Sequence, residues 1–464
     1  MSSRPITVPL HTVRVNAAEV AGPLETWRHT FGHGGINSLP LPKRVVEGVQ
    51  RLRPRLIRTF IQEYFRVYEG SGRFHWERLD PYMDALAATG AKVVAAICIK
   101  PQAIFPEVDA AKWRPRDVGE WQRVVAALVR RYSVERPIVT HWEIGNETDI
   151  GEDGGCPYLI QRPEDYAEYY DMTVAPILEA FPQAQVGGPA VAGVFNEPLP
   201  GLIRHCAASG QRLDFISWHL YHSDPALHDF AARHARSLLE GFPGRRPQLF
   251  LTEFNRRLGE LPSLEESAFD TRRAGALGAI LLALSRAGVD ATFHYHMWDQ
   301  LCFHEDFAPI FSPKGLAGMT RHWNEVPHRL GLFGVGGEVR PQYFVYEMLR
   351  RLGDERLPAQ AEGELGVLAG RGESGGQGGS CEAAVFLVNY SIDEHYDRAA
   401  RLLFTGLAPG RKKLTVYRID DERRWEESSL ALLPVEQRDL STDGNLECHV
   451  LLPADSVALA CLAT

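Results

Sequence analysis

Short apolar runs alternate with longer amphipathic segments from about residue 30 to residue 350, and this rhythm most constrains the fold. The apolar runs are rich in β-branched residues, and the segments between them have helical period. Such alternation is typical of βα units in a parallel sheet. The predicted strands are eight in number and span residues 30–36, 56–61, 92–99, 138–144, 185–189, 215–221, 248–254 and 291–298.

Eight βα units can close into a barrel or form a doubly wound open sheet. No G-x-G-x-x-G or G-K-[ST] turn follows any of the predicted strands, which disfavours a nucleotide-binding open sheet. The sequence therefore predicts an α/β fold with a (β/α)8 TIM barrel. In such a barrel the functional residues lie at the carboxyl ends of the strands.

The segments between the strands carry clear helix signals. Apolar residues recur at helical spacing over 118–132, and a second stripe over 163–181 follows Pro163, a residue suited to a first helical turn. A closing helix is predicted over 342–352, with Gly353 able to adopt the left-handed conformation that ends a helix.

The pattern changes after about residue 355. Short runs at 383–390, 413–417 and 457–462 alternate with turn-rich segments, which predicts an antiparallel β-sandwich. The Gly/Ser-rich stretch 370–380 is predicted to be a flexible hairpin loop. We expect three parts: an N-terminal segment 1–20, whose run 6–15 adds a strand to the sandwich, a catalytic barrel 21–353 and an accessory sandwich 354–464.

Composition limits the partners, the cysteine chemistry and the cellular location to be expected. The net charge of −9 argues against a nucleic-acid partner. The seven cysteines are widely spaced, without a C-x-x-C pair, so neither a disulfide framework nor a zinc site is expected. No apolar run is long enough to span a membrane, and the start lacks the apolar region of a secretory signal. A cytoplasmic protein is the expectation, although a sequence trimmed of its leader would look the same.

Two strand ends carry the residues of greatest chemical interest. The fourth predicted strand runs into Asn146-Glu147, and the seventh ends in Thr252-Glu253. A single strand-end glutamate is more often solvated or paired with arginine. Two of them at one barrel mouth, by contrast, provide the paired carboxyl groups that glycosidic bond hydrolysis requires.

These residues resemble clan A of the glycoside hydrolases, and most closely family 39, the β-xylosidases and α-L-iduronidases. The resemblance extends over the runs 74–80 and 214–221 and to Arg58. It implies that Glu147 is the general acid/base and Glu253 the nucleophile. Asn146 would bind the hydroxyl next to the anomeric carbon, and Arg58 would favour the ionised form of Glu253.

Further substrate contacts are expected around this pair. The resemblance places His219 and Tyr221 of the sixth strand beside the sugar. In the eighth strand His294, His296 and Trp298 would share one face, and Trp298 could stack on the sugar ring. His33, in the turn after the first strand, is a weaker candidate. A metal site of His294 and His296 with Asp299 is disfavoured, so neither metal nor cofactor is expected.

The sequence also departs from family 39. Gly145 precedes Asn146-Glu147, whereas family 39 enzymes commonly have Trp at this position. The Gly-Asn-Glu form is similar to that of the family 51 α-L-arabinofuranosidases. Residues 60–63 also lack the His-Gly pair of β-xylosidases. The leading hypothesis is a retaining hydrolase that cleaves a terminal glycosidic bond by double displacement, with β-xylosidase first. The alternatives are an α-L-arabinofuranosidase, β-glucosidase, β-galactosidase or uronidase, or a non-catalytic carbohydrate-binding barrel. Endo action and a homo-oligomer are left open.

Overall fold

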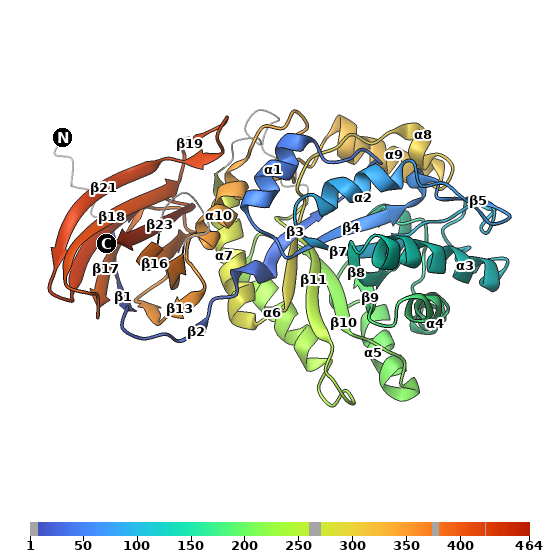
Figure 1. The fold of residues 1–464 in the computed structure, drawn as a ribbon, viewed down its shortest axis with the longest axis horizontal. Coiled ribbons are helices and arrows are strands. Elements are labelled where there is room, and N and C mark those ends of the chain that lie inside the picture. The colour runs from blue at the N-terminus through green and yellow to red at the C-terminus, as the bar shows by residue number, and fades with distance from the viewer. Residues whose placement is uncertain (1–7, 259–270, 374–379, 423) are drawn as a thin grey trace.

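Eight parallel strands close into a barrel in the computed structural model, which describes residues 8–258, 271–373, 380–422 and 424–464. Neighbouring strands pair in chain order, and β12 closes the ring against β3. The predicted (β/α)8 barrel is therefore confirmed (Figure 1). The barrel strands are β3 (His29–His33), β4 (Leu56–Gln62), β7 (Lys92–Cys98), β8 (Val139–Ile144), β9 (Gln185–Val191), β10 (Phe215–Tyr221), β11 (Gln248–Asn255) and β12 (Ala291–Tyr295).

Helices surround the barrel and bury their apolar faces against it. The predicted stripe over 118–132 is buried from Trp121 onward, whereas Val118 is exposed. The first turn of α3 is capped by the Asp117 side chain, which accepts from the Glu120 amide. Beyond Val129 the chain continues in a wider turn, Arg130–Glu135. The helices are α1 (Lys43–Arg51), α2 (Leu79–Ala87), α3 (Val118–Val129), α4 (Pro163–Ala180), α5 (Pro198–Ser209), α6 (Pro225–Ser237), α7 (Arg272–Ala287) and α10 (Pro341–Arg350).

Two barrel strands end three residues earlier than predicted. β3 stops at His33 and not at residue 36, because Gly34 and Gly35 have φ values of +98° and +86° that no extended strand allows. β12 stops at Tyr295 and not at residue 298. Beyond it the Met297 amide still donates to the Gly32 carbonyl of β3, but the carbonyls of His296 and Met297 accept from the amides of residues 332 and 333. The predicted ends at 36 and 298 are therefore wrong.

A long connection between β12 and α10 lies beside the barrel mouth. It contains α8 (His304–Phe307) and α9 (Pro313–Thr320), followed by a wider turn, Arg321–Glu325. Between β4 and α2, β5 (Tyr68–Gly70) and β6 (Arg73–Phe74) form a small ribbon. The run 74–80 that carries part of the family resemblance starts in this ribbon and ends in α2.

The remaining strands form two sheets that pack as a sandwich. The sheets differ from the expected antiparallel pattern in one place, because β1 runs parallel to β17 and antiparallel to β14. One sheet contains β14 (Ala359–Ala361), β1 (Leu10–Asn16), β17 (Arg398–Thr405) and β22 (Leu446–Leu452). The other contains β2 (Gly22–Pro23), β13 (Glu355–Leu357), β15 (Gly366–Glu373), β16 (Ser380–Asn389), β23 (Ser456–Ala463), β18 (Gly410–Ile419) and β21 (Pro434–Thr442). A ribbon of β19 (Trp425–Glu426) and β20 (Ala431–Leu432) completes this part.

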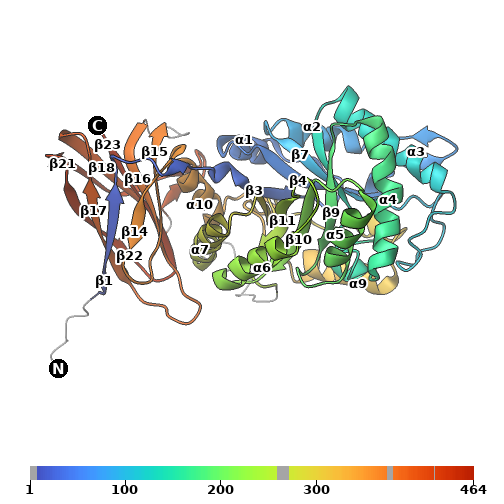
Figure 2. The same ribbon diagram turned by 90° about the horizontal axis from the view of Figure 1, so that it is seen from below.

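The helices α7 and α10 lie between the barrel and the seven-stranded sheet (Figure 2). Contact is close, since a Cβ placed on Gly275 of α7 would be 2.3 Å from the carbonyl oxygen of Asp455. The stretch 370–380 belongs partly to β15 and β16, and its residues 374–379 lie outside the described chain. The division into domains at residues 20 and 353 stays a prediction. Among the described residues, no helix is long and apolar enough to cross a bilayer.

Candidate active site

The carboxyl ends of seven barrel strands open into one cavity of about 450 Å³. Its floor and inner walls come from residues at the ends of β3, β4, β8, β9, β10, β11 and β12, and its outer wall comes from the connection that carries α9. This is the edge of the barrel at which the sequence predicted the functional residues. The lining residues include Phe60, Asn146, Glu147, Glu152, Gly154, Tyr221, Glu253, Tyr295, Met319 and Trp323.

The turn after β8 places Glu147 at the mouth. Gly145 has φ +85°, and Glu147 itself has φ +44°, an unusual value for a residue with a side chain. The Glu147 amide donates to the Ala190 carbonyl at 2.8 Å, so the strained backbone is tied to the end of β9. Strain of this kind persists only where the surroundings hold it, and it concentrates at functional sites.

The carboxyl group of Glu147 is almost enclosed. Its Oε1 lies 2.8 Å from Nδ1 of His219, a fully buried side chain on β10. Burial raises the pKa of Glu147 to about 8, the negative charge of Asp149 adds to the rise, and Arg58 opposes it. Burial also lowers the pKa of His219, although the charge of Glu253 opposes this. Near neutral pH these two pKa shifts therefore favour a protonated Glu147 beside a neutral His219 imidazole.

Glu253 at the end of β11 is held differently. Arg58 donates from Nη1 to its Oε1 at 2.7 Å, and the Tyr221 hydroxyl donates to its Oε2 at 2.5 Å. Both oxygens of this carboxylate thus accept a hydrogen bond, one of them from a cation. The two glutamates therefore lie in contrasting environments, which is how one site can assign different roles to two carboxyl groups.

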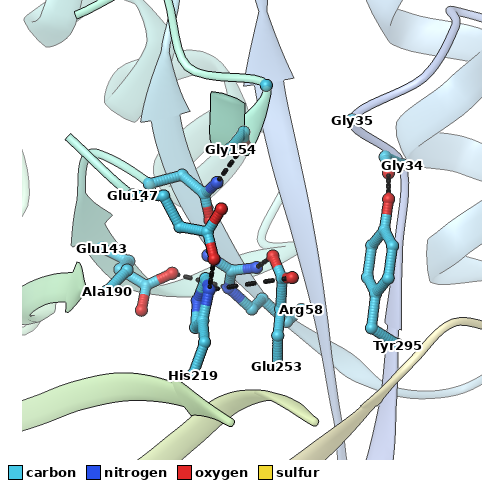
Figure 3. A network of polar contacts seen from close by, with 12 residues as sticks. Gly34, Gly35, Arg58, Glu143, Glu147, Gly154, Ala190, His219, Glu253 and Tyr295 are labelled. Carbon is cyan, nitrogen blue, oxygen red and sulfur yellow. Dashed lines mark hydrogen bonds and ion pairs between the residues drawn. The ribbon is translucent and has the colours of Figure 1, made fainter. Parts of the chain in front are cut away.

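Arg58 on β4 links three side chains below the cavity. Besides Glu253, it donates to Glu143 at 2.6 Å (Figure 3). It also donates to the Asn146 side-chain oxygen at 2.6 Å. Burial alone would lower the pKa of Arg58, but the charges of Glu143 and Glu253 raise it above its usual value. The guanidinium is consequently a permanent charge that fixes the positions of all three partners.

Glu143 is a site residue that the sequence reasoning missed. It is fully buried on β8, and an ionised side chain in that position needs a charged partner. An acidic residue within a predicted barrel strand was the available signal. Its partner could not be read from the sequence, because Arg58 lies 85 positions away.

The two strand-end glutamates meet as expected. One carboxyl oxygen of Glu147, one of Glu253 and a ring nitrogen of His219 all lie within 4.8 Å of one another. Nδ1 of His219 is 3.7 Å from Oε2 of Glu253, so the imidazole lies between the two carboxyl groups. Asn146 and Tyr221 line the cavity with the glutamates, while Arg58 and His219 lie behind its wall.

Three predicted contacts lie elsewhere. His33, His296 and Trp298 are buried and do not line the cavity. The rings of His33 and Trp298 stack with centroids 6.1 Å apart, and His296 bonds to Asp299. The aromatic walls are formed instead by residues not predicted for this role, namely Phe60, Tyr295 and Trp323.

Metal binding has one candidate within the described part of the chain, the cluster of Glu147, His219 and Glu253. The Arg58 guanidinium, 2.7 Å from Glu253, would repel a cation there. The alternative site on the eighth strand does not assemble. Asp299 is paired with Arg340 and His296, whereas Nε2 of His294 faces Asn255 and the Leu330 carbonyl.

Comparisons with known proteins agree with this geometry. Residues 12–234 match the model of glycosyl hydrolases family 39. The chain is 20% identical over 381 residues to a β-xylosidase of Geobacillus stearothermophilus, covering 73% of this chain and 70% of that protein. It is 22% identical over 324 residues to a β-xylosidase of Caldicellulosiruptor saccharolyticus, covering 64% and 61%. A crystal structure of a family 39 enzyme from Xanthomonas axonopodis pv. citri superposes with a TM-score of 0.75 at 18% identity, covering 98% and 97%.

The fold, the paired carboxyl groups and these relatives define the class of the protein, which is a glycoside hydrolase. Its substrates are accordingly glycosides. Within that class, the chain is similar to family 39, as the matched model and the two related β-xylosidases indicate.

Proposed function

We propose that this protein is a retaining exo-glycosidase, first of all a β-xylosidase, with Glu147 as acid/base and Glu253 as nucleophile. The observation that carries the proposal is the approach of their carboxyl oxygens to within 4.8 Å. Retaining enzymes hold the two groups about 5–5.5 Å apart, whereas inverting enzymes need about 6.5–9.5 Å to fit a water molecule. The related β-xylosidases support xylose as the sugar.

The first step uses the two contrasting environments. A carboxylate oxygen of Glu253 bonds to the anomeric carbon while the bond to the leaving oxygen breaks, and Glu147 donates its proton to that oxygen. The raised pKa of Glu147, about 8, keeps the proton available at neutral pH. Arg58 and Tyr221 hold the Glu253 carboxylate in position for attack.

His219 determines which oxygen of Glu147 carries the proton. A neutral imidazole protonated at Nδ1 donates to Oε1, so the acidic proton resides on Oε2. His219 is thus a positioning residue in this mechanism, a different role from the sugar contact that the sequence resemblance implied. Oε2 is also the oxygen nearest to Gly154, at the wall of the cavity.

The second step returns the enzyme to its starting state. Glu147, now ionised, accepts a proton from a water molecule whose oxygen bonds to the anomeric carbon. The bond to Glu253 breaks, and that residue leaves as a carboxylate. Net inversion at each step gives retention overall, and one water molecule is consumed.

The proposal is tested with two variants and a panel of aryl glycosides. Glu253→Gln should nearly abolish turnover. Glu147→Ala should lose about 10²–10⁴-fold on poor leaving groups and far less on activated ones. The exposed Glu240→Gln serves as a matched control that should behave as wild type. Normal turnover in either active-site variant would refute the assignment.

Sugar and stereochemistry are measured on the same material. The panel contains β-xyloside, α-L-arabinofuranoside, β-glucoside, β-galactoside and uronide, and NMR of the first-formed anomer reports retention or inversion. In Glu147→Ala an activated substrate should leave its sugar on Glu253, and the added mass on that peptide identifies the sugar. Inversion, or a sugar attached to another residue, would overturn the mechanism.

A further inference from the structure

The outer wall of the cavity is attached to the turn that follows Glu147. Helix α9 contributes Gly315 and Met319 to this wall, and the facing turn contributes Glu152 and Gly154. The turn is short and continuous with Glu147, whose carbonyl accepts from the amides of Ile150 and Gly151. A displacement of α9 would therefore be felt directly beside Glu147.

Glu152 makes the attachment. Its Oε1 accepts from the Ser312 amide at 2.7 Å, and its Oε2 bonds to the Ser312 hydroxyl. Ser312 is the N-cap of α9, and its hydroxyl accepts from the Gly315 amide. A carboxylate at this end of a helix is stabilised by the free amides and by the helix dipole.

Close packing reinforces the attachment. A Cβ on Gly315 would lie 2.5 Å from Oε2 of Glu152, so a larger residue could occupy this position only if Glu152 or the helix moved. On the next turn of α9, the Met319 sulfur lies 3.8 Å from the position of a Cβ on Gly155. The exposed pair Lys314–Asp153 adds little, because surface ion pairs are screened by solvent.

We propose that Glu152 is a specificity-determining positioning residue, which holds α9 as the wall on the leaving-group side and thereby limits the leaving groups that the enzyme accepts. This rests on the proposed function, because the side of the cavity nearest Glu147 faces the leaving group only if Glu147 protonates the leaving oxygen. One extra or missing methylene group in a pocket discriminates between substrates by about 10- to 200-fold, so a small shift of this wall is expected to have a measurable effect.

The test compares leaving groups at a constant sugar. For Glu152→Ala, we expect kcat/KM on oligosaccharides to rise about tenfold relative to kcat/KM on small aryl glycosides, because the released wall admits a larger group. The wall lies on the leaving-group side, so the relative kcat/KM of different sugars at a constant leaving group should stay unchanged. A merely structural defect would lower kcat/KM on oligosaccharides and on aryl glycosides together.

Two more variants keep the test decisive. Gly315→Ala pushes α9 and Glu152 apart and should shift the same ratio of kcat/KM values. Glu152→Gln removes the charge with little change in shape. The matched control is Glu305→Ala, an exposed glutamate of α8 on the same connection, outside the cavity lining. Thermal melting identifies any variant that does not fold.

The proposal is overturned if the leaving-group ratio is unchanged in Glu152→Ala and Gly315→Ala. It is also overturned if the choice of sugar changes at a constant leaving group. Neither result would affect the proposed function, which fails only if the variants of Glu147 and Glu253 remain active or the product is inverted.

Discussion

Gly154 offers the most direct test of how precisely Glu147 must be placed. A Cβ on Gly154 would lie 2.1 Å from Oε2 of Glu147 and 2.7 Å from its Cβ. To restore even 3.0 Å, the oxygen must retreat by about 0.9 Å, and rotation of the side chain cannot relieve the second contact. Oε1 is meanwhile held by His219. Gly154→Ala should therefore displace the proposed acid.

The expected loss follows from that displacement. A misplacement of about 1 Å costs roughly 10²-fold in rate, which lies within the range of about 10²–10⁴-fold that general acid catalysis contributes. We expect kcat/KM of Gly154→Ala to fall about 10²-fold on poor leaving groups. On activated leaving groups, which need little protonation, the loss should be under about tenfold.

The assay is a series of aryl glycosides of one sugar with leaving groups of graded acidity. Weaker acid assistance makes log kcat/KM depend more steeply on the pKa of the leaving group. Gly193→Ala is the matched control, because a Cβ there meets its nearest neighbour at 3.5 Å, an ordinary contact. An equal loss across the series, or wild-type kinetics, would refute the reasoning.

Three further predictions follow from the same network. On poor leaving groups kcat/KM should decline as the pH rises through about 8, because Glu147, with its pKa raised to about 8, then loses its proton; a decline already complete at pH 6 would contradict this. Tyr221→Phe should lower kcat/KM roughly 10- to 100-fold at unchanged melting temperature, because Glu253 loses a charge-assisted hydrogen bond. Glu143→Ala should reduce the free energy of unfolding in urea by about 3–5 kcal/mol, because it leaves the buried Arg58 with one carboxylate fewer; a loss under about 1 kcal/mol would show that Arg58 does not need this partner.

The features that the sequence predicted depend on residues close together in the chain, whereas those that it did not predict depend on residues far apart in the chain. The barrel strands were predicted because apolar alternation is a local property, and β10 was predicted to the residue. Glu147 and Glu253 were predicted to converge because the carboxyl ends of parallel barrel strands share one mouth. Predicting that these two side chains converge required no knowledge of any other side chain.

The eighth strand shows where the local rule fails. Alternation along 291–298 placed His294, His296 and Trp298 on one face. Regular strand structure ends at Tyr295, however, and the carbonyls of His296 and Met297 then accept from the amides of residues 332 and 333. This second partner lies in a connection whose path no local pattern specifies, so Tyr295 reaches the cavity and Trp298 does not.

The sequence by itself determined the barrel, the location of its functional edge and the two glutamates, since periodicity and strand direction are carried by neighbouring residues. Only the tertiary structure decided the environments that distinguish the glutamates and the wall that bounds the cavity. Arg58 donates a hydrogen bond to Glu253, 195 positions away in sequence, and Glu152 accepts one from Ser312, 160 positions away. Hydrogen bonds and charges act over a few ångströms of space whatever the separation in sequence, so these pairs exist only once the chain has folded.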